Sequence, residues 1–280
     1  MPYDKPIRNF SEFTKSSSLR EKTRVFARDI AIRLLSFQKP KEMKEGWIRF
    51  PYYHHVFDDE RKGFEKHLRF FSNSGDVICI DDAVKLLESS RPINGQYFCI
   101  TFDDGFKNWI ENAVPILVEH SLRAAFFVPT GYIGLDVIKN RDQVLNFFPG
   151  GDHLVEFLDW KDCKAIIDAG MTIGSHGVGH KKLIQLSIED VVDELKTSKE
   201  IIEEKTEKPC THFCCPFGRP GIDFLPESHP KIAADIGYQS FLTGHRGLNI
   251  EGDSPFNIQR DHLLANWGEE QLRYFLFGGN

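Results

Sequence analysis

The chain has 280 residues and a mass of 32.2 kDa, a length that allows one large domain or two small ones. Hydrophobic residues make up 41% of it and charged residues 27%, which is the composition of a globular protein and excludes wholesale disorder. The net charge of −6 excludes a globally basic nucleic-acid-binding protein, so we expect no nucleic-acid partner.

The charge is distributed unevenly along the chain. Residues 1–44 hold 11 Lys and Arg against 5 Asp and Glu, a net charge of +6, and the other 236 residues hold 24 against 36, a net charge of −12. We therefore expect two parts: a basic helical extension over residues 1–45 and an acidic domain over residues 46–280.

Residues 18–37 predict an amphipathic helix with Ser18 as its N-cap. Arg20, Arg24 and Arg28 follow one another at i, i+4 spacing and form a basic stripe along it. The simpler interpretation is a helix packed on a domain, because acidic residues interrupt this stripe. The alternative is peripheral contact with anionic lipid at the inner face of a membrane.

The N-terminus and the cysteines bear on the location of the protein. Residues 1–18 are polar, unlike a secretion signal, and the apolar stretch over residues 30–37 is far shorter than the ~20 residues that a membrane span needs. The six cysteines are sparse, and Cys210, Cys214 and Cys215 lack the spacing of a zinc ribbon. These features predict free structural thiols and a cytoplasmic protein.

From residue 50 onward, short apolar runs alternate with helical patterns. Strands are expected over residues 77–80, 97–102, 124–128, 171–174, 212–215 and 239–242. Helices are expected over residues 64–71, 160–169 and 187–205, and Pro115 should start or kink another over 108–121. This alternation predicts an α/β fold with a mostly parallel sheet, open or closed, and residues 135–157 form a long insertion in it.

The first motif that carries chemistry is Thr-Phe-Asp-Asp-Gly at residues 101–105, directly after a predicted strand. Neighbouring carboxylates on a strand point to opposite faces, so Asp103 and Asp104 can share a site only if the backbone bends, which Gly105 permits. Two carboxylates in different surroundings suit a metal ligand and a general base. The alternative is a solvated Asp-Asp-Gly turn.

The second motif also follows a strand, and sites in parallel α/β proteins gather at that edge. His176 and His180 are four residues apart, so they would project from the same side of one helical turn, the geometry for two imidazoles on one cation. One carboxylate with two imidazoles leaves positions open for water, whose pKa a divalent metal lowers from about 15.7 to about 7. Zinc, iron, cobalt or nickel could all occupy such a site, and the spacing alone does not decide among them.

A third motif, Phe-Cys-Cys-Pro-Phe-Gly at residues 213–218, ends another strand in a sharp turn. A backbone N–H in this turn could face an oxyanion, and an ordinary proline turn is the alternative.

In this order the three motifs resemble those of the polysaccharide deacetylase family, the chitooligosaccharide-deacetylase-like carbohydrate esterases, over about three quarters of the chain. The resemblance implies a single distorted (β/α)7-type barrel that removes acetyl groups from N-acetylated sugars with the help of a metal. By position it implies Asp103 as general base, Asp104, His176 and His180 as metal ligands, and the backbone N–H of Phe217 as oxyanion donor.

Within the family, the chain most resembles the branch that includes poly-N-acetylglucosamine deacetylases. That branch begins with a Tyr-His pair, matched here by Tyr53-His54, and its third motif is Pro-aromatic-Gly, matched by Pro216-Phe217-Gly218.

Two departures from the family pattern lead to further hypotheses. The family's Arg two residues before the third-motif Pro is replaced by Cys214, and the late Leu-His that supplies a general acid is not recognisable. We hypothesise that Arg260 takes the place of the missing Arg beside Asp103, and that His54 serves as acid or substrate contact. The alternatives for the acid are His55, His245 and His262, and Arg219 is a further candidate for substrate contact.

The expected function is hydrolysis of an N-acetylated or similarly acylated amino sugar to the free amine and a carboxylate. A two-histidine, one-carboxylate site also serves non-haem iron oxygenases, but those use all-β double-sheet folds. A non-catalytic carbohydrate-binding protein would not need Asp103 and Asp104 together beside the histidine pair. The substrate stays open between a glycan, a sugar nucleotide and a lipid-linked saccharide, and the polar N-terminus favours the last two.

Overall fold

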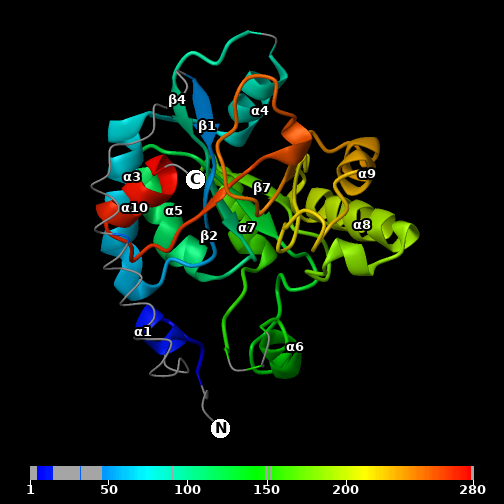
Figure 1. Ribbon diagram of the computed structural model, residues 1–280. Helices are drawn as coiled ribbons and strands as arrows, with labels where there is room; N and C mark the ends of the chain where they lie inside the picture. The colour runs from blue at the N-terminus through cyan, green and yellow to red at the C-terminus, as the bar shows by residue number, and fades with distance from the viewer. Residues whose placement is uncertain are drawn as a thin grey trace.

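The computed structural model describes residues 5–14, 32, 46–89, 91–148, 151 and 153–278 (Figure 1). The amphipathic helix expected over residues 18–37 lies outside these ranges, apart from Ile32. Within the described part of the chain, no helix combines the length and the apolar character that crossing a membrane requires.

The centre of the molecule is a seven-stranded sheet whose strands are all parallel, in the order β10-β2-β5-β6-β7-β8-β9. The strands are β2 (Pro51–Tyr53), β5 (Ile100–Asp103), β6 (Ala124–Val128), β7 (Thr172–Ser175), β8 (His212–Cys214), β9 (Ser240–Leu242) and β10 (Asp261–His262). The predicted α/β fold is therefore confirmed, and the strands at 124–128, 171–174, 212–215 and 239–242 are placed to within one residue.

The segment over residues 258–262 closes this curled sheet into a barrel. At one end, the backbone of Ile258 exchanges hydrogen bonds with Phe241 and Thr243 beside β9. At the other end, β10 pairs with β2, and the Asp261 N–H donates to the carbonyl of Phe50 at 2.9 Å. The sequence analysis predicted no strand here, because a two-residue strand is too short to show an apolar period.

A second sheet of three strands lies at the opposite end of the molecule from α1 and α6 (Figure 1). It contains β1 (Trp47–Arg49), β3 (Asp76–Val77) and β4 (Gln96–Phe98). The single strand expected over 97–102 is wrong, because the chain passes from this sheet into the barrel at Cys99. The strand expected over 77–80 is also too long, since α4 starts at Ile80. Both runs are almost entirely apolar, so periodicity could not separate their parts.

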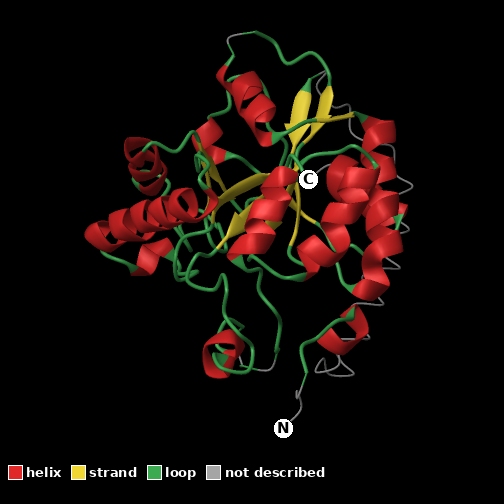
Figure 2. Cartoon of the chain, turned by 180° about the vertical axis from the view of Figure 1, so that it is seen from behind, coloured by secondary structure: helices red, strands yellow, loops and turns green. Residues whose placement is uncertain are grey.

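Helices pack around the barrel, as the view from behind shows (Figure 2). They are α1 (Phe10–Phe13), α3 (Arg61–Ser74), α4 (Ile80–Glu88), α5 (Val114–Glu119), α6 (Arg141–Leu145), α7 (Trp160–Asp168), α8 (Ile188–Thr206), α9 (His229–Ile236) and α10 (Glu269–Phe277). Short helical turns are η1 (Asp58–Glu60), η2 (Trp109–Ala113), η3 (Leu183–Gln185) and η4 (Pro255–Asn257). Ser187 caps α8 by accepting the Asp190 N–H at 3.1 Å, as its sequence predicts.

Phenylalanine fills the barrel core. Phe102 on β5 and Phe126 on β6 stack with ring centroids 4.6 Å apart, and Trp109 and Tyr53 pack against this pair. All four side chains are fully buried, so their contacts fix neighbouring strands in register and hold the strand ends together.

Residues 5–14 lie against the barrel and do not extend away from it. The Ile7 N–H donates to the carbonyl of Leu154 at 2.8 Å, and Asp58 donates its backbone N–H to Arg8 at 3.0 Å. Arg8 also forms an ion pair with Glu111 at 2.9 Å. These contacts hold residues 5–14 against the 135–157 insertion, at the end of the molecule where Figure 1 shows α1 and α6.

Glu60 ends η1 and is buried, with 3% of the residue exposed. Its carboxylate accepts the Phe57 N–H at 3.1 Å, and burial raises its pKa to about 7. Between the ordinary pKa of 4.5 and this value, the folded protein binds more protons than the unfolded chain. The stability that protonated Glu60 contributes is therefore complete below pH 4.5 and is lost as the pH rises through about 7.

We predict that the free energy of unfolding of Glu60→Gln changes less with pH between pH 4.5 and pH 7 than that of the wild-type protein. In the wild-type protein the Glu60 contribution to the free energy of unfolding should fall by up to about 3 kcal/mol between pH 4.5 and pH 7. Denaturant unfolding at a series of pH values measures this free energy. The exposed α4 residue Glu88, replaced by Gln, is the matched control and should keep the wild-type slope. An unchanged slope in Glu60→Gln would contradict the assignment.

Candidate active site

The loops that follow β5, β7 and β8 meet β2 and β10 around one cavity of about 290 Å³. The predicted site residues that line it are His54, Asp103, Asp104, His176, His180, Phe217 and Arg260. The barrel thus brings together three motifs that are spread over more than 100 residues of the chain, because the carboxyl ends of parallel strands share one edge.

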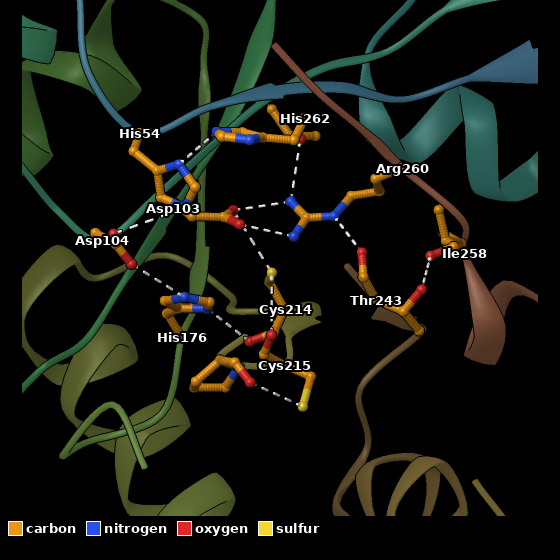
Figure 3. Close-up of polar contacts among 12 residues, drawn as sticks. His54, Asp103, Asp104, His176, Cys214, Cys215, Thr243, Ile258, Arg260 and His262 are labelled. Carbon is orange, nitrogen blue, oxygen red and sulfur yellow. Dashed lines mark hydrogen bonds and ion pairs between the residues drawn. The ribbon is translucent and has the colours of Figure 1, made fainter. Parts of the chain in front are cut away.

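The two adjacent carboxylates are separated by a left-handed backbone. Asp104 has φ +91° and Gly105 has φ +77°, so the chain turns sharply at the end of β5. A positive φ is costly for a residue with a β-carbon, and such strain is concentrated at functional sites. As a result, Asp103 faces Arg260 while Asp104 faces the histidines (Figure 3). The sequence located the bend at Gly105, and the structure extends it to Asp104.

Arg260 holds Asp103 through two hydrogen bonds, from Nη1 to Oδ1 at 2.8 Å and from Nη2 to Oδ2 at 2.7 Å. Arg260 is itself fixed, since its Nε donates to the Thr243 carbonyl at 2.7 Å and its guanidinium lies 4.1 Å from the Tyr52 ring centroid. Burial raises the pKa of Asp103, but the charge and hydrogen bonds of Arg260 outweigh it and leave the pKa below its usual value. Arg260 thus lies beside Asp103, where the sequence analysis expected it, and its replacement of the family Arg stays a prediction. Cys214 Sγ lies 3.5 Å from the same carboxylate.

Asp104, His176 and His180 present a set of ligand atoms suited to a cation. Asp104 Oδ1 lies 3.4 Å from His176 Nε2 and 3.1 Å from His180 Nε2, and all three atoms are within 4.8 Å of one another. Asp104 Oδ1 is buried without a hydrogen-bond donor aligned to it. His176 donates Nδ1–H to the Cys214 carbonyl at 2.7 Å, which leaves the Nε2 lone pair pointing at Asp104. These residues fit a divalent metal.

The two histidines come from a loop and not from the helical turn that their spacing predicted, so this expectation is wrong. The loop turns at Gly177, with φ +76°, and at His180, with φ +52°. Glu194 on α8 holds it, because one carboxylate oxygen accepts the N–H groups of Val178 at 2.8 Å and Gly179 at 2.5 Å.

A second contact from α8 supports the same loop. Ser198 donates to the Gly177 carbonyl at 3.0 Å and shares a 2.7 Å hydrogen bond with Ser175. A β-carbon on Gly177 would lie only 3.0 Å from the Glu194 carboxylate oxygen. The glycines therefore admit the carboxylate that positions the histidines, a role for Glu194 that the sequence analysis missed.

The third motif exposes a backbone donor. Phe217 has φ +61°, and its N–H has no acceptor among the described residues. Gly218 is required here, because a β-carbon on it would overlap the backbone of Gly244. The Phe217 ring lies 4.8 Å from the His180 ring, so Phe217 lies beside one of the candidate metal ligands. Pro216 precedes it and accepts the N–H of Gly218 at 2.7 Å.

The other predicted histidines divide into two groups. His54 lies in the cavity, with Nδ1 at 3.0 Å from His262 Nε2 and Nε2 at 3.8 Å from Asp104 Oδ2. His262 and His55 also line the cavity, and burial lowers the pKa of each to about 3, so both are neutral near pH 7. His245 is not part of the cavity lining.

Arg219 does not line the cavity either. It forms a two-point ion pair with the carboxylate of Asp223, with Nε–Oδ2 at 2.7 Å and Nη2–Oδ1 at 3.0 Å.

An aromatic lining was not found from the sequence. Phe10 and Phe13 of α1 and Phe147 and Phe148 of the insertion line the same cavity as the catalytic candidates. Only the length of the insertion signalled a functional loop, and nothing in residues 5–14 pointed to this cavity.

A parallel α/β barrel with a carboxylate and two imidazoles at the carboxyl ends of its strands is a construction typical of metal-dependent hydrolases. The model of the polysaccharide deacetylase family matches residues 91–241, and the chain belongs to this family. This confirms the resemblance on which the sequence analysis relied.

Individual relatives agree with the family and the fold. The Bacillus subtilis protein YxkH, whose name assigns it only provisionally to polysaccharide deacetylases, is 23% identical over 201 residues, which are 71% of this chain and 63% of YxkH. The Streptococcus pyogenes deacetylase PplD superposes with a TM-score of 0.65 at 20% identity, covering 83% of this chain and 99% of PplD. IcaB from Ammonifex degensii superposes with a TM-score of 0.66 at 18% identity, covering 84% and 99%. These similarities confirm the (β/α)7-type barrel.

We predict strong energetic coupling between Arg260 and Asp103. Arg260→Met should cost about 3–5 kcal/mol in the free energy of unfolding, because it leaves a buried carboxylate without its partner. In an Asp103→Asn background the same substitution should cost clearly less, as chemical denaturation of both single variants and the double variant measures. The exposed pair Arg273 and Glu269 is the control, with an expected coupling below about 0.5 kcal/mol. Additive effects at Arg260 and Asp103 would contradict the assigned ion pair.

We also predict that Glu194 positions the metal ligands. Glu194→Ala should weaken the binding of zinc or cobalt at least tenfold, since loss of groups that orient metal ligands typically costs about 10–100-fold in affinity. Glu194→Gln should restore most of it, because the amide oxygen can accept the same two N–H groups. Calorimetric titration of the metal-free variants measures both. Asp193→Ala, on the exposed side of α8, is the control and should bind metal with wild-type affinity. Wild-type metal affinity in Glu194→Ala would contradict the positioning role.

Proposed function

We propose that the protein is a metal-dependent hydrolase that removes an N-acetyl or related acyl group from an amino sugar, giving the free amine and a carboxylate. The observation that carries this proposal is the pair of neighbouring carboxylates with different partners. Asp103 is held ionised by Arg260, and Asp104 faces two imidazoles with an unsatisfied buried oxygen. A non-catalytic carbohydrate-binding protein would have no use for this division of roles.

Asp103 would act as general base. Its carboxylate is buried and ionised, and the two hydrogen bonds from Arg260 keep it in one orientation while it takes a proton from the attacking water. The Phe217 N–H would donate to the carbonyl oxygen of the scissile amide as negative charge develops there, which costs no reorganisation because the backbone is already fixed.

His54 would serve as general acid or as a substrate contact. It lies in the cavity within 3.8 Å of Asp104, and its Nδ1 is paired with the neutral His262. This pairing orients the ring and leaves Nε2 to face the site, where it could pass a proton to the departing amine nitrogen.

Asp104, His176 and His180 would hold the divalent metal, with zinc as the expected ion. When bound, such a cation supplies Lewis-acid polarisation of the amide carbonyl and lowers the pKa of a coordinated water. The buried Asp104 carboxylate is suited to this role, because burial raises its pKa but the neighbouring imidazoles outweigh that and hold its pKa well below the usual range.

The substrate and the location complete the proposal. We infer an amino sugar that is accessible at an inner membrane face or in the cytoplasm, as a sugar nucleotide or a lipid-linked saccharide. The basic character of residues 1–44 supports it, since a net charge of +6 would attract phosphate groups or anionic lipid.

We predict that replacing the general base and replacing the metal ligands have different effects on metal content and activity. Asp103→Asn should lower acetate release from an N-acetylhexosamine substrate by about 10²–10⁴-fold while metal remains bound, because only proton transfer is lost. The double variant His176→Ala/His180→Ala should lose both metal and activity, and a chelator should abolish wild-type activity until metal is restored.

His245→Ala is the matched control for these variants, because His245 does not line the cavity and should retain metal and rate. Metal analysis of the purified proteins and an acetate assay give the two readouts. Wild-type metal content in the double histidine variant would contradict the assignment of the metal ligands. An equal rate of acetate release with and without a chelator would contradict the proposed metal dependence.

A further inference from the structure

The cavity continues from the catalytic residues along a wall of phenylalanine side chains. We call Phe10, Phe13, Phe57, Phe147 and Phe148 the aromatic wall. It begins at the catalytic centre, where the Phe147 ring stacks on His180 at 4.6 Å. It then runs ring to ring, from Phe147 to Phe148 at 5.2 Å, from Phe148 to Phe13 at 5.8 Å and from Phe13 to Phe57 at 5.4 Å. The apolar surface is thus continuous with the site of reaction.

The polar groups beside this wall already have partners. His55 stacks on the Phe57 ring at 4.5 Å, and its Nδ1 is 3.0 Å from the Asn108 amide. The Glu60 carboxylate accepts the Phe57 N–H, and the apolar surroundings raise its pKa to about 7. Leu263, Leu264 and Ala265 also line the cavity. A sugar ring carries several hydroxyl groups, and burying them here without partners would be costly.

The wall is built from three separate parts of the chain that are tied together. The Phe13 carbonyl accepts a hydrogen bond from His153 Nε2 at 2.9 Å, which joins α1 to the insertion. Ile7 and Leu154 make a second tie, through a backbone hydrogen bond of 2.8 Å. These ties hold the rings in place without a ligand, so the apolar surface is pre-formed.

From this arrangement, we propose that the aromatic wall is a subsite for an apolar aglycone, so that the preferred substrate is an acylated amino sugar joined to a lipid or another apolar group. The inference rests on the proposed function and specifies its substrate class. An apolar group on the sugar would bury surface against the rings, while the acylated nitrogen lies at Asp103 and Asp104.

The charge of the chain favours the aglycone over a long acyl group as the occupant. Residues 1–44 contain α1 and carry a net charge of +6, in a chain whose remainder is acidic. A lipid carrier is joined to its sugar through phosphate, so an apolar chain and an anionic linker on one substrate match both features. An N-acyl chain would match only the wall.

The experiment compares three synthetic substrates below their micelle concentrations, with metal-loaded enzyme. They are the methyl and the octyl glycosides of N-acetylglucosamine and the methyl glycoside of N-octanoylglucosamine, and appearance of the free amine gives kcat/KM. The octyl glycoside should exceed the methyl glycoside at least tenfold, since each buried methylene is worth about fourfold. Phe13→Ala and Phe148→Ala should each reduce this ratio at least fivefold.

Ile138→Ala is the matched control, since Ile138 is in the same insertion but is 83% exposed and outside the cavity, and its ratio should equal that of the wild type. Thermal unfolding identifies a variant that has lost its fold, and two wall positions keep the test informative if one fails. Equal rates for methyl and octyl glycosides would overturn the subsite and leave the proposed function standing. A preference confined to the N-octanoyl substrate would overturn the aglycone assignment. Absence of amine release from all three would instead count against the proposed function.

Discussion

The buried ion pair between Arg260 and Asp103 connects the closure of the barrel to its chemistry. Arg260 lies in the segment that joins β9 to β10 and β2, and Asp103 ends β5. Neither charge could be buried alone, because removing a charge from water costs several kcal/mol unless a partner compensates it. The barrel must therefore close in the observed register for the Asp103 carboxylate, the proposed general base, to be ionised, and this carboxylate in turn holds the closing segment in place.

The remaining site geometry depends on backbone conformations that are costly by themselves. Asp104, His180 and Phe217 all have positive φ, and each is a residue to which we assign a role. Such conformations persist only where surrounding contacts enforce them. Glu194 supplies such contacts to the histidine loop, and the close approach of Gly218 to Gly244 supplies them to the third motif.

Two residues of the N-terminal segment line the cavity that contains the candidate active site, although the charge distribution assigned them to a separate extension. Phe10 and Phe13 line the cavity, and Arg8 is paired with acidic residues of the barrel. The positive net charge of residues 1–44 would attract a negatively charged substrate, and the rings of Phe10 and Phe13 would contact an apolar group on it. This is why the proposed subsite and the charge asymmetry point to the same kind of molecule.

The sequence by itself determined the class of fold and the chemical types at the site. Alternating apolar runs and helical patterns revealed a parallel sheet, and the Asp-Asp and His-x3-His motifs at strand ends revealed Asp103, Asp104, His176 and His180, because these signals are local in the chain. Tertiary structure alone decided that Arg260 meets Asp103 across 157 positions, that Glu194 shapes the histidine loop, and that Phe13 and Phe148 share a cavity. These contacts depend on the register of the closed barrel and on the docking of distant loops, which leave no period or spacing in the sequence.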